Sequence, residues 1–179
     1  MRASGSAVIV LAVALSACKV PHPPDVLKVS DVETHWAIDS ASGTTQYIAP
    51  VVRFRVTNVG PEPLTSIQAT ATFRRKGEEN VTWGSDFRAV ATRQAPLGPG
   101  QHVDVVMKSD ARYFSTGAAE TMFTHAEFRD ARVEFFLRIR SSPWSPFGAA
   151  EVERRIGARG VQAAAAPSPA PPASAPAQP

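Results

Sequence analysis

The sequence contains very little cysteine, since Cys18 is the single cysteine among 179 residues. One thiol excludes an intramolecular disulfide framework and any zinc site built from clustered cysteines. The chain also lacks a strong excess of one charge, because 19 Lys and Arg residues face 16 Asp and Glu residues. A balance this even argues against a nucleic-acid binder, so we expect no nucleic-acid partner.

The apolar run at the N-terminus is too short to cross a membrane. Residues 7–15 (AVIVLAVAL) would span about 13 Å as a helix, less than half of a bilayer core of ~30 Å. Arg2 precedes this run and the small residues Ser16 and Ala17 follow it. Such an arrangement is typical of a secretory signal peptide, which we predict over residues 1–17.

The four residues Leu15-Ser16-Ala17-Cys18 resemble the lipobox of bacterial lipoproteins. The resemblance implies that Cys18 is acylated after cleavage before it, and two or more acyl chains would give stable membrane anchoring. Lys19 stands where an Asp favours inner-membrane retention in enterobacterial members, so it favours the outer membrane, at its periplasmic face or the cell surface. The alternative is an ordinary signal peptide followed by a chance cysteine.

The mature chain divides into a tether, a domain and a tail. Residues 18–25 contain three prolines and form a stiff tether behind the lipidated cysteine. Residues 26–160 have the length of one domain. Residues 161–179 are predicted to be a disordered tail, because residues 163–179 consist almost entirely of Ala and Pro and offer no large apolar group to bury. The tail would be a spacer, a reach into the cell wall or a proline-motif ligand.

Apolar and polar residues alternate with period two in four segments, which predicts antiparallel strands packed on one side. These segments are residues 51–57, 67–74, 103–108 and 132–140. Further strands are expected at 26–38, about 86–94 and 151–156, and a helical turn at about 117–127. Turn-forming residues separate the strands. The predicted fold is an all-β, immunoglobulin-like antiparallel β-sandwich of about seven strands, with at most one short helix.

Residues 54–73 and 95–109 are similar to immunoglobulin-like domains of bacterial secreted and lipid-anchored proteins, in particular the FxLYD and CARDB-like groups. The shared features are a strand ending in N-x-G, here Asn58-Val59-Gly60, and an L-x-P-G turn, here Leu97 to Gly100, before a further strand. The resemblance implies adhesion, scaffolding or protein–protein contact. It implies no catalytic residues.

Motifs for catalysis or metal binding are missing from the sequence. The four histidines have no metal-ligand spacing, and neither a G-x-S-x-G, an H-E-x-x-H nor a P-loop motif occurs. We therefore expect no enzyme activity, no metal site and no cofactor. The histidines are His22, His35, His102 and His125.

Several arginines lie at outward positions of the predicted strands. Arg53, Arg55, Arg138 and Arg140 would form a basic face if their strands share a sheet, and that face could bind an anionic ligand or a partner. The alternative is a solvated face balanced by acidic residues. Trp144, framed by prolines, would be either a binding tip or a cap on the core.

These features predict a lipid-anchored protein of the bacterial cell envelope. Its expected role is a non-catalytic interaction or scaffold module of an envelope assembly, with the membrane and an envelope protein as partners. The alternative is a lipid- or glycan-binding carrier that uses the arginine face or a cavity of the sandwich.

Overall fold

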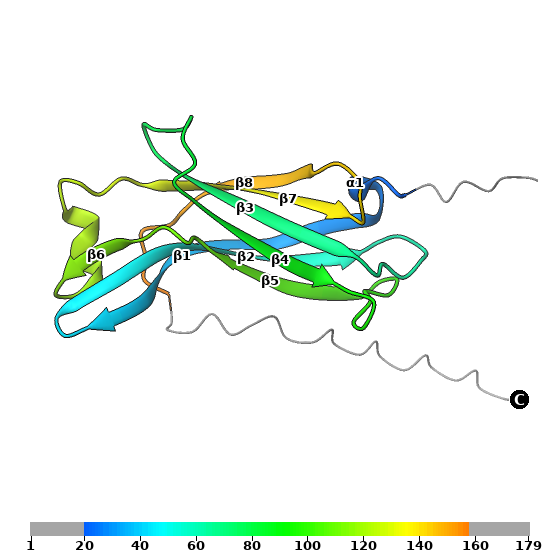
Figure 1. Ribbon diagram of the computed structural model, residues 1–179, viewed down its shortest axis with the longest axis horizontal. Helices are drawn as coiled ribbons and strands as arrows, with labels where there is room; N and C mark the ends of the chain where they lie inside the picture. The colour runs from blue at the N-terminus through cyan, green and yellow to red at the C-terminus, as the bar shows by residue number, and fades with distance from the viewer. Residues whose placement is uncertain (1–19, 158–179) are drawn as a thin grey trace, which may run out of the picture.

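A computed structural model describes residues 20–157 and confirms the predicted all-β sandwich. The chain forms two antiparallel sheets of four strands each, packed face to face (Figure 1). The strands are β1 (Leu27–Ser42), β2 (Thr45–Asn58), β3 (Ile67–Arg75), β4 (Gly84–Ala91), β5 (His102–Lys108), β6 (Tyr113–Thr116), β7 (Ala131–Ile139) and β8 (Ser145–Glu151). The helices are α1 (Pro23–Val26) and the 3-10 helix η1 (Ala119–Thr124).

The pairs β1/β2, β3/β4 and β7/β8 form hairpins, whereas β5 and β6 each pair with β2. The first sheet has the order β1-β2-β5, with β6 paired to the early part of β2. The second sheet has the order β4-β3-β7-β8. We call the end of the sandwich beside α1 the α1 end, and the opposite end the β6 end (Figure 1).

The period-two pattern of the sequence explains the main core. Alternate residues of β2, β3, β5 and β7 are buried between the sheets, and the residues between them point outward. Phe54 from the first sheet stacks on Phe135 from the second, with ring centroids 4.6 Å apart. Gly148 of β8 lies so close to the Phe135 ring that an added Cβ would be 2.5 Å from its Cζ.

Aromatic side chains close the β6 end. Trp36 is fully buried, and four rings surround it with centroids 5.2 to 6.3 Å away. The burial of these rings contributes most to closing this end, because large aromatic side chains remove the greatest apolar area from water. The surrounding residues are Trp83, Tyr113, Phe123 and Phe128.

A buried amide closes the α1 end. The Asn58 side chain is fully buried, and its Nδ2 donates to the carbonyl oxygens of Glu62 and Leu97 at 2.8 and 2.9 Å. Its Oδ1 accepts the backbone N–H of Gly60 at 2.9 Å. One side chain therefore joins the loop after β2 to the loop before β5, which explains the N-x-G sequence at this position.

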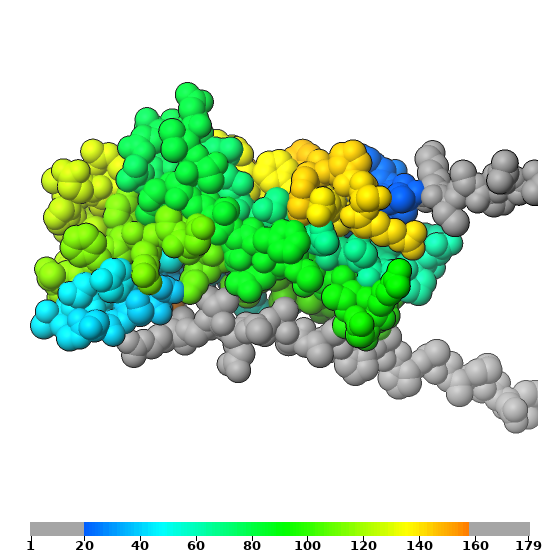
Figure 2. Space-filling view, in the orientation of Figure 1, coloured from blue at the N-terminus to red at the C-terminus, as the bar shows by residue number. Residues whose placement is uncertain are grey.

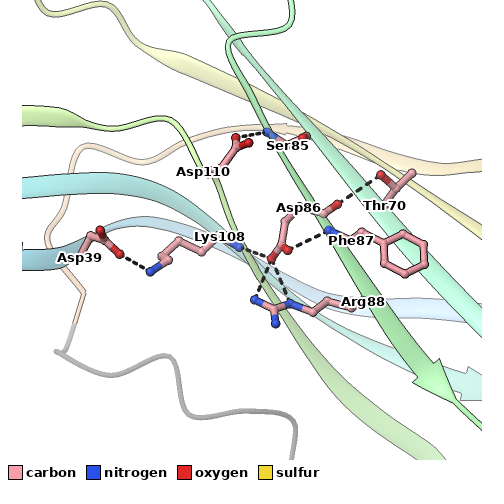
Figure 3. Close-up of polar contacts among 8 residues, drawn as sticks. All are labelled: Asp39, Thr70, Ser85, Asp86, Phe87, Arg88, Lys108 and Asp110. Carbon is pink, nitrogen blue, oxygen red and sulfur yellow. Dashed lines mark hydrogen bonds and ion pairs between the residues drawn. The ribbon is translucent and has the colours of Figure 1, made fainter.

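Carboxylates join the edges of β4 and β5, which belong to different sheets (Figure 3). Asp86 Oδ2 accepts the backbone N–H of Lys108 at 2.9 Å, and Asp110 Oδ1 accepts that of Ser85 at 2.7 Å. Lys108 itself reaches Asp39 of β1 through its ammonium group. Arg88 also binds Asp86, at 3.0 Å. These contacts cover edge groups of both strands.

One predicted strand is wrong, and two strands were missed. Residues 151–156 form no strand: β8 ends at Glu151, and Ile156 makes only an isolated bridge to Trp36. The edge strand β8 was not predicted, because Pro146 and Gly148 interrupt the alternation of apolar and polar residues by which the other strands were identified. The four-residue β6 is too short to show a period.

The helical turn predicted at about 117–127 is confirmed as the 3-10 helix Ala119–Thr124. The end of the predicted extended tether, Pro23–Val26, turns into α1, because proline at the first helical position already has a helical φ. None of the helices within residues 20–157 is long and apolar enough to span a bilayer. Cys18, Lys19 and the predicted tail lie outside the described residues.

Candidate interaction surface

The structure separates the four arginines expected to share one face. Arg53 and Arg55 lie on β2 in the first sheet, whereas Arg138 lies on β7 in the second sheet and Arg140 just after it. The expectation of a single basic sheet face is therefore wrong. Sequence patterns give the orientation of each side chain relative to its own sheet, but they do not say which sheet holds each strand.

Carboxylates neutralise the pair on the first sheet. Arg53 Nη2 donates to Asp104 Oδ2 at 2.8 Å, and Arg55 Nε donates to Asp104 Oδ1 at 2.9 Å. Arg55 also contacts Asp31, which projects from a bulge of β1 with a φ of 53°. The hydrogen bonds from Arg55 and Arg53 lower the pKa of Asp104. This face of the first sheet is an ion-pair network and carries little net charge.

On the second sheet, aromatic rings are exposed beside an arginine. Phe87 of β4 is 53% exposed and Trp144, just before β8, is 36% exposed. Their rings meet edge to face at a centroid distance of 6.4 Å and an angle of 86°. The Arg138 guanidinium lies over the Trp144 ring at 4.5 Å and donates from Nε to Gln68. We call Phe87, Trp144 and Arg138 the aromatic–arginine cluster.

The register of the second sheet extends this cluster across the strands. Phe87 of β4 pairs with Thr70 of β3, Thr70 pairs with Phe136 of β7, and Phe136 pairs with Pro146 of β8. These four positions are outward-facing and none of them is buried. The outer face of the second sheet therefore carries a row in which Phe87, Phe136 and Pro146 are apolar and Thr70 is the one polar member. The core-cap interpretation of Trp144 does not hold, because its ring lies on this outer face.

Protein-binding surfaces often combine these residue types. Trp and Arg are enriched among the residues that dominate binding free energy, and they act best where an apolar centre excludes water. A guanidinium stacked on an indole keeps its N–H donors available at the edge for a carboxylate. Arg138 forms no ion pair with a carboxylate within residues 20–157.

A pocket of about 490 Å³ opens at the β6 end between β6 and η1. It includes Ser115 and His125, whose polar groups make local contacts. Ser115 Oγ lies 3.1 Å from Thr121 Oγ1, and His125 Nδ1 accepts the backbone N–H of Glu127 at 3.2 Å. No hydrogen bond joins a serine to a histidine in this pocket among the described residues. The pocket therefore shows no assembled nucleophile and base.

His35 is the least exposed of the four histidines. His35 of β1 packs against Gly157, and burial is the main cause that lowers its pKa, followed by the charge of Arg155. Across residues 20–157, no group of three or more His, Cys, Asp or Glu side chains is arranged to hold a metal ion.

Sequence reasoning missed Phe87 and the counter-ions Asp31 and Asp104. The outward position of Asp104 was visible in the period of β5, but its partners follow only from the pairing of β5 with β2. The exposure of Phe87 was not predicted, because buried and exposed residues do not alternate clearly along the edge strand β4.

No family model matches the chain, and no curated protein matches it either. Among solved structures, the chain is similar to part of a β-glucuronidase from Bacteroides uniformis, with 18% identity and a TM-score of 0.40. The match covers 71% of this chain and 12% of that chain. A protein from Archaeoglobus fulgidus matches with 14% identity and a TM-score of 0.37, covering 69% of this chain and 94% of that one. Similarities at this level carry no information on function.

Proposed function

We propose that this protein is a lipid-anchored, non-catalytic interaction module of the bacterial cell envelope. In this proposal Cys18 carries the lipid, and the outer face of the second sheet contacts a protein partner. The partner offers an apolar patch bordered by a carboxylate that binds the guanidinium of Arg138. The observation that carries the proposal is the aromatic–arginine cluster, in which two exposed rings lie beside an arginine that has no carboxylate partner among the described residues.

Charge and exposure support a partner on this face. Two large rings, those of Phe87 and Trp144, remain in contact with water. Arg138 is held in place by its hydrogen bond to Gln68 and by the Trp144 ring, so little side-chain entropy is lost when it binds. A preorganised arginine beside exposed aromatic rings favours binding of an acidic, partly apolar protein surface.

The carrier alternative has less support. It required the four arginines on one face, and these residues lie on two sheets. The space between the sheets is occupied by the side chains of two hydrophobic clusters. The interaction module is therefore the function that the geometry supports best.

The anchor has its own test, the Cys18→Ser change in the full chain. Acylation at Cys18 predicts that this variant leaves the membrane fraction or accumulates as an uncleaved precursor. A Cys18→Ser protein that is cleaved normally and remains with membranes would refute the lipid anchor.

The partner face is tested by site-specific photo-crosslinking in intact cells. A crosslinking residue in place of Phe87 should give one adduct of defined mass, and Trp144→Ala in the same chain should abolish it. The matched control is the crosslinker in place of Phe114, which is 65% exposed at the β6 end.

Two outcomes would refute the proposed face. The first is an adduct of the same mass and yield from position 114, which would indicate contact by proximity alone. The second is an adduct at position 87 that persists after both Trp144→Ala and Arg138→Gln. Retention of the adduct in Arg138→Lys but not in Arg138→Gln would support a carboxylate on the partner.

A further inference from the structure

A polar depression of about 550 Å³ lies at the α1 end, on the side of the second sheet. Two arginines line it from two different loops: Arg93 follows β4 and Arg140 follows β7. The remaining polar lining consists of hydroxyl and amide side chains, including Ser66, Thr92 and Ser141. No carboxylate belongs to this lining. The depression therefore offers hydrogen-bond donors to an anion, and its lining contains no carboxylate that would bind the arginines instead.

Arg93 and Arg140 have no carboxylate partner among the described residues, unlike most arginines there. Arginines elsewhere, such as Arg53, Arg55 and Arg154, bind carboxylates within the sandwich. Neither Arg93 nor Arg140 forms an ion pair within residues 20–157, and both are exposed. Their planar forks match the oxygens of a phosphate group.

The backbone holds Arg140 in a defined position. Its φ is 52°, a left-handed conformation that a side chain of this size rarely adopts. The Arg140 N–H donates to the Ser66 carbonyl oxygen at 3.0 Å, which ties the turn after β7 to the start of β3. The surrounding structure therefore stabilises a strained residue beside the depression, as is common at binding sites.

A second, smaller depression of about 340 Å³ connects this site to the entering chain. Arg140 lines both depressions, and Pro21 lines the smaller one. Pro21 is three residues after Cys18, a distance of about 10 Å at full extension. Figure 2 shows the first described residues, in blue, and the loop after β4 at the same end of the molecule. A lipid on Cys18 would therefore bring this end to the membrane surface.

We infer that Arg93 and Arg140 bind phosphate groups of an anionic lipid surface, so that the α1 end faces the membrane. This inference rests on the lipid anchor of the proposed function for its geometry. Glu62 and Asp25 lie at the same end, and Glu62 lines the smaller depression, so the anion is held in the larger one. The sandwich is thereby oriented with β6 away from the lipid.

Vesicle binding tests the site without the anchor. The protein is residues 18–179 with Cys18→Ser, which retains every described element and cannot be acylated. Co-sedimentation is measured with vesicles of phosphatidylglycerol and phosphatidylcholine, and with phosphatidylcholine alone. Binding should require the anionic lipid and weaken as salt is added, since the contact is electrostatic.

The test variant is Arg93→Gln/Arg140→Asn, in which asparagine tolerates the positive φ at position 140. Each basic residue near an anionic surface contributes about 1 kcal/mol, so the double variant should bind roughly thirty-fold more weakly. The matched control is Arg132→Gln, an exposed arginine of β7 at the β6 end, which should change binding less than about two-fold. The pair Arg93→Lys/Arg140→Lys should retain most of the binding, and unchanged cooperative unfolding of each variant shows that it is folded.

Three results would overturn the inference. Equal binding to phosphatidylcholine alone would exclude the anionic headgroup, and equal losses in the double variant and in Arg132→Gln would exclude this site. Saturable binding of inorganic phosphate that is lost in the double variant, together with no binding to the anionic vesicles, would assign the site to a free phosphate instead. Because the protein carries no lipid here, a failure would leave the Cys18→Ser test of the anchor unaffected.

Discussion

At the α1 end the sandwich is closed by one buried amide and two loops, whereas at the β6 end it is closed by aromatic rings packed around Trp36. The α1 end is held by hydrogen bonds of Asn58, which require defined distances and angles. The β6 end is held by burial of apolar surface and by dispersion between the rings, which tolerate small changes in orientation. Fixed loops suit a site whose arginines must keep their positions, and such loops occur at the α1 end.

The largest expected effect of a single change is at the β6 end. Trp36→Ala removes a fully buried ring that contacts four others, so it should cost about 3–5 kcal/mol in the free energy of unfolding. The loss would be measured by urea denaturation. Phe114→Ala, on an exposed ring of the same end, should change stability by less than about 0.5 kcal/mol. Equal effects of the two changes would show that Trp36 does not organise this end.

The corresponding change at the α1 end is Asn58→Ala. It leaves two carbonyl oxygens and one N–H without their partner, which should cost about 2–4 kcal/mol. Asn80→Ala, on the exposed loop after β3, is the control and should be nearly neutral. Amide exchange should rise in the loops 59–64 and 97–101 before the rest of the sandwich; a uniform rise would argue against the stapling role of Asn58.

The region between the ends is tested by Gly148→Ala. The new Cβ would overlap the Phe135 ring, which in turn stacks on Phe54, so the cost should be about 1–3 kcal/mol. The control is Ala149→Gly, a neighbouring exposed position, where the effect should be smaller. A neutral Gly148→Ala, measured by thermal unfolding, would mean that β8 can move away from the core.

The smallest effect concerns pH. Burial lowers the pKa of His35, so the native state disfavours its protonation. A lowered native pKa adds stability above the unfolded pKa, and this contribution is lost as the pH falls from 7 toward 5. His35→Gln should flatten this part of the stability profile. The exposed His102 offers the control, and a His102→Gln profile that flattens equally would contradict the assignment to His35.

The sequence predicts the central strands well because each of them is buried on one side only. The residue sets of β2, β3, β5 and β7 follow directly from period two. The same reasoning fails for β8, an edge strand that contains proline and glycine, and for residues 151–156, whose apolar side chains pack without a ladder.

The surface is less predictable than the core. The alternation shows that Arg53 and Arg138 point outward, but their distance depends on which strands share a sheet. Contacts such as Arg55 with Asp104 and Phe87 with Trp144 join strands that are far apart in the sequence. Such pairs arise from tertiary register, which local periodicity does not encode.

The carboxylates between β4 and β5 affect how readily neighbouring molecules could associate through their strand edges. If the proposed lipid anchor holds these chains on one membrane, they meet at a high effective concentration in two dimensions, and open strand edges would act as templates for association. Asp86 and Asp110 occupy the N–H groups of Lys108 and Ser85. These donors are therefore not available to a strand of a neighbouring molecule, which limits strand pairing at this side of the sandwich.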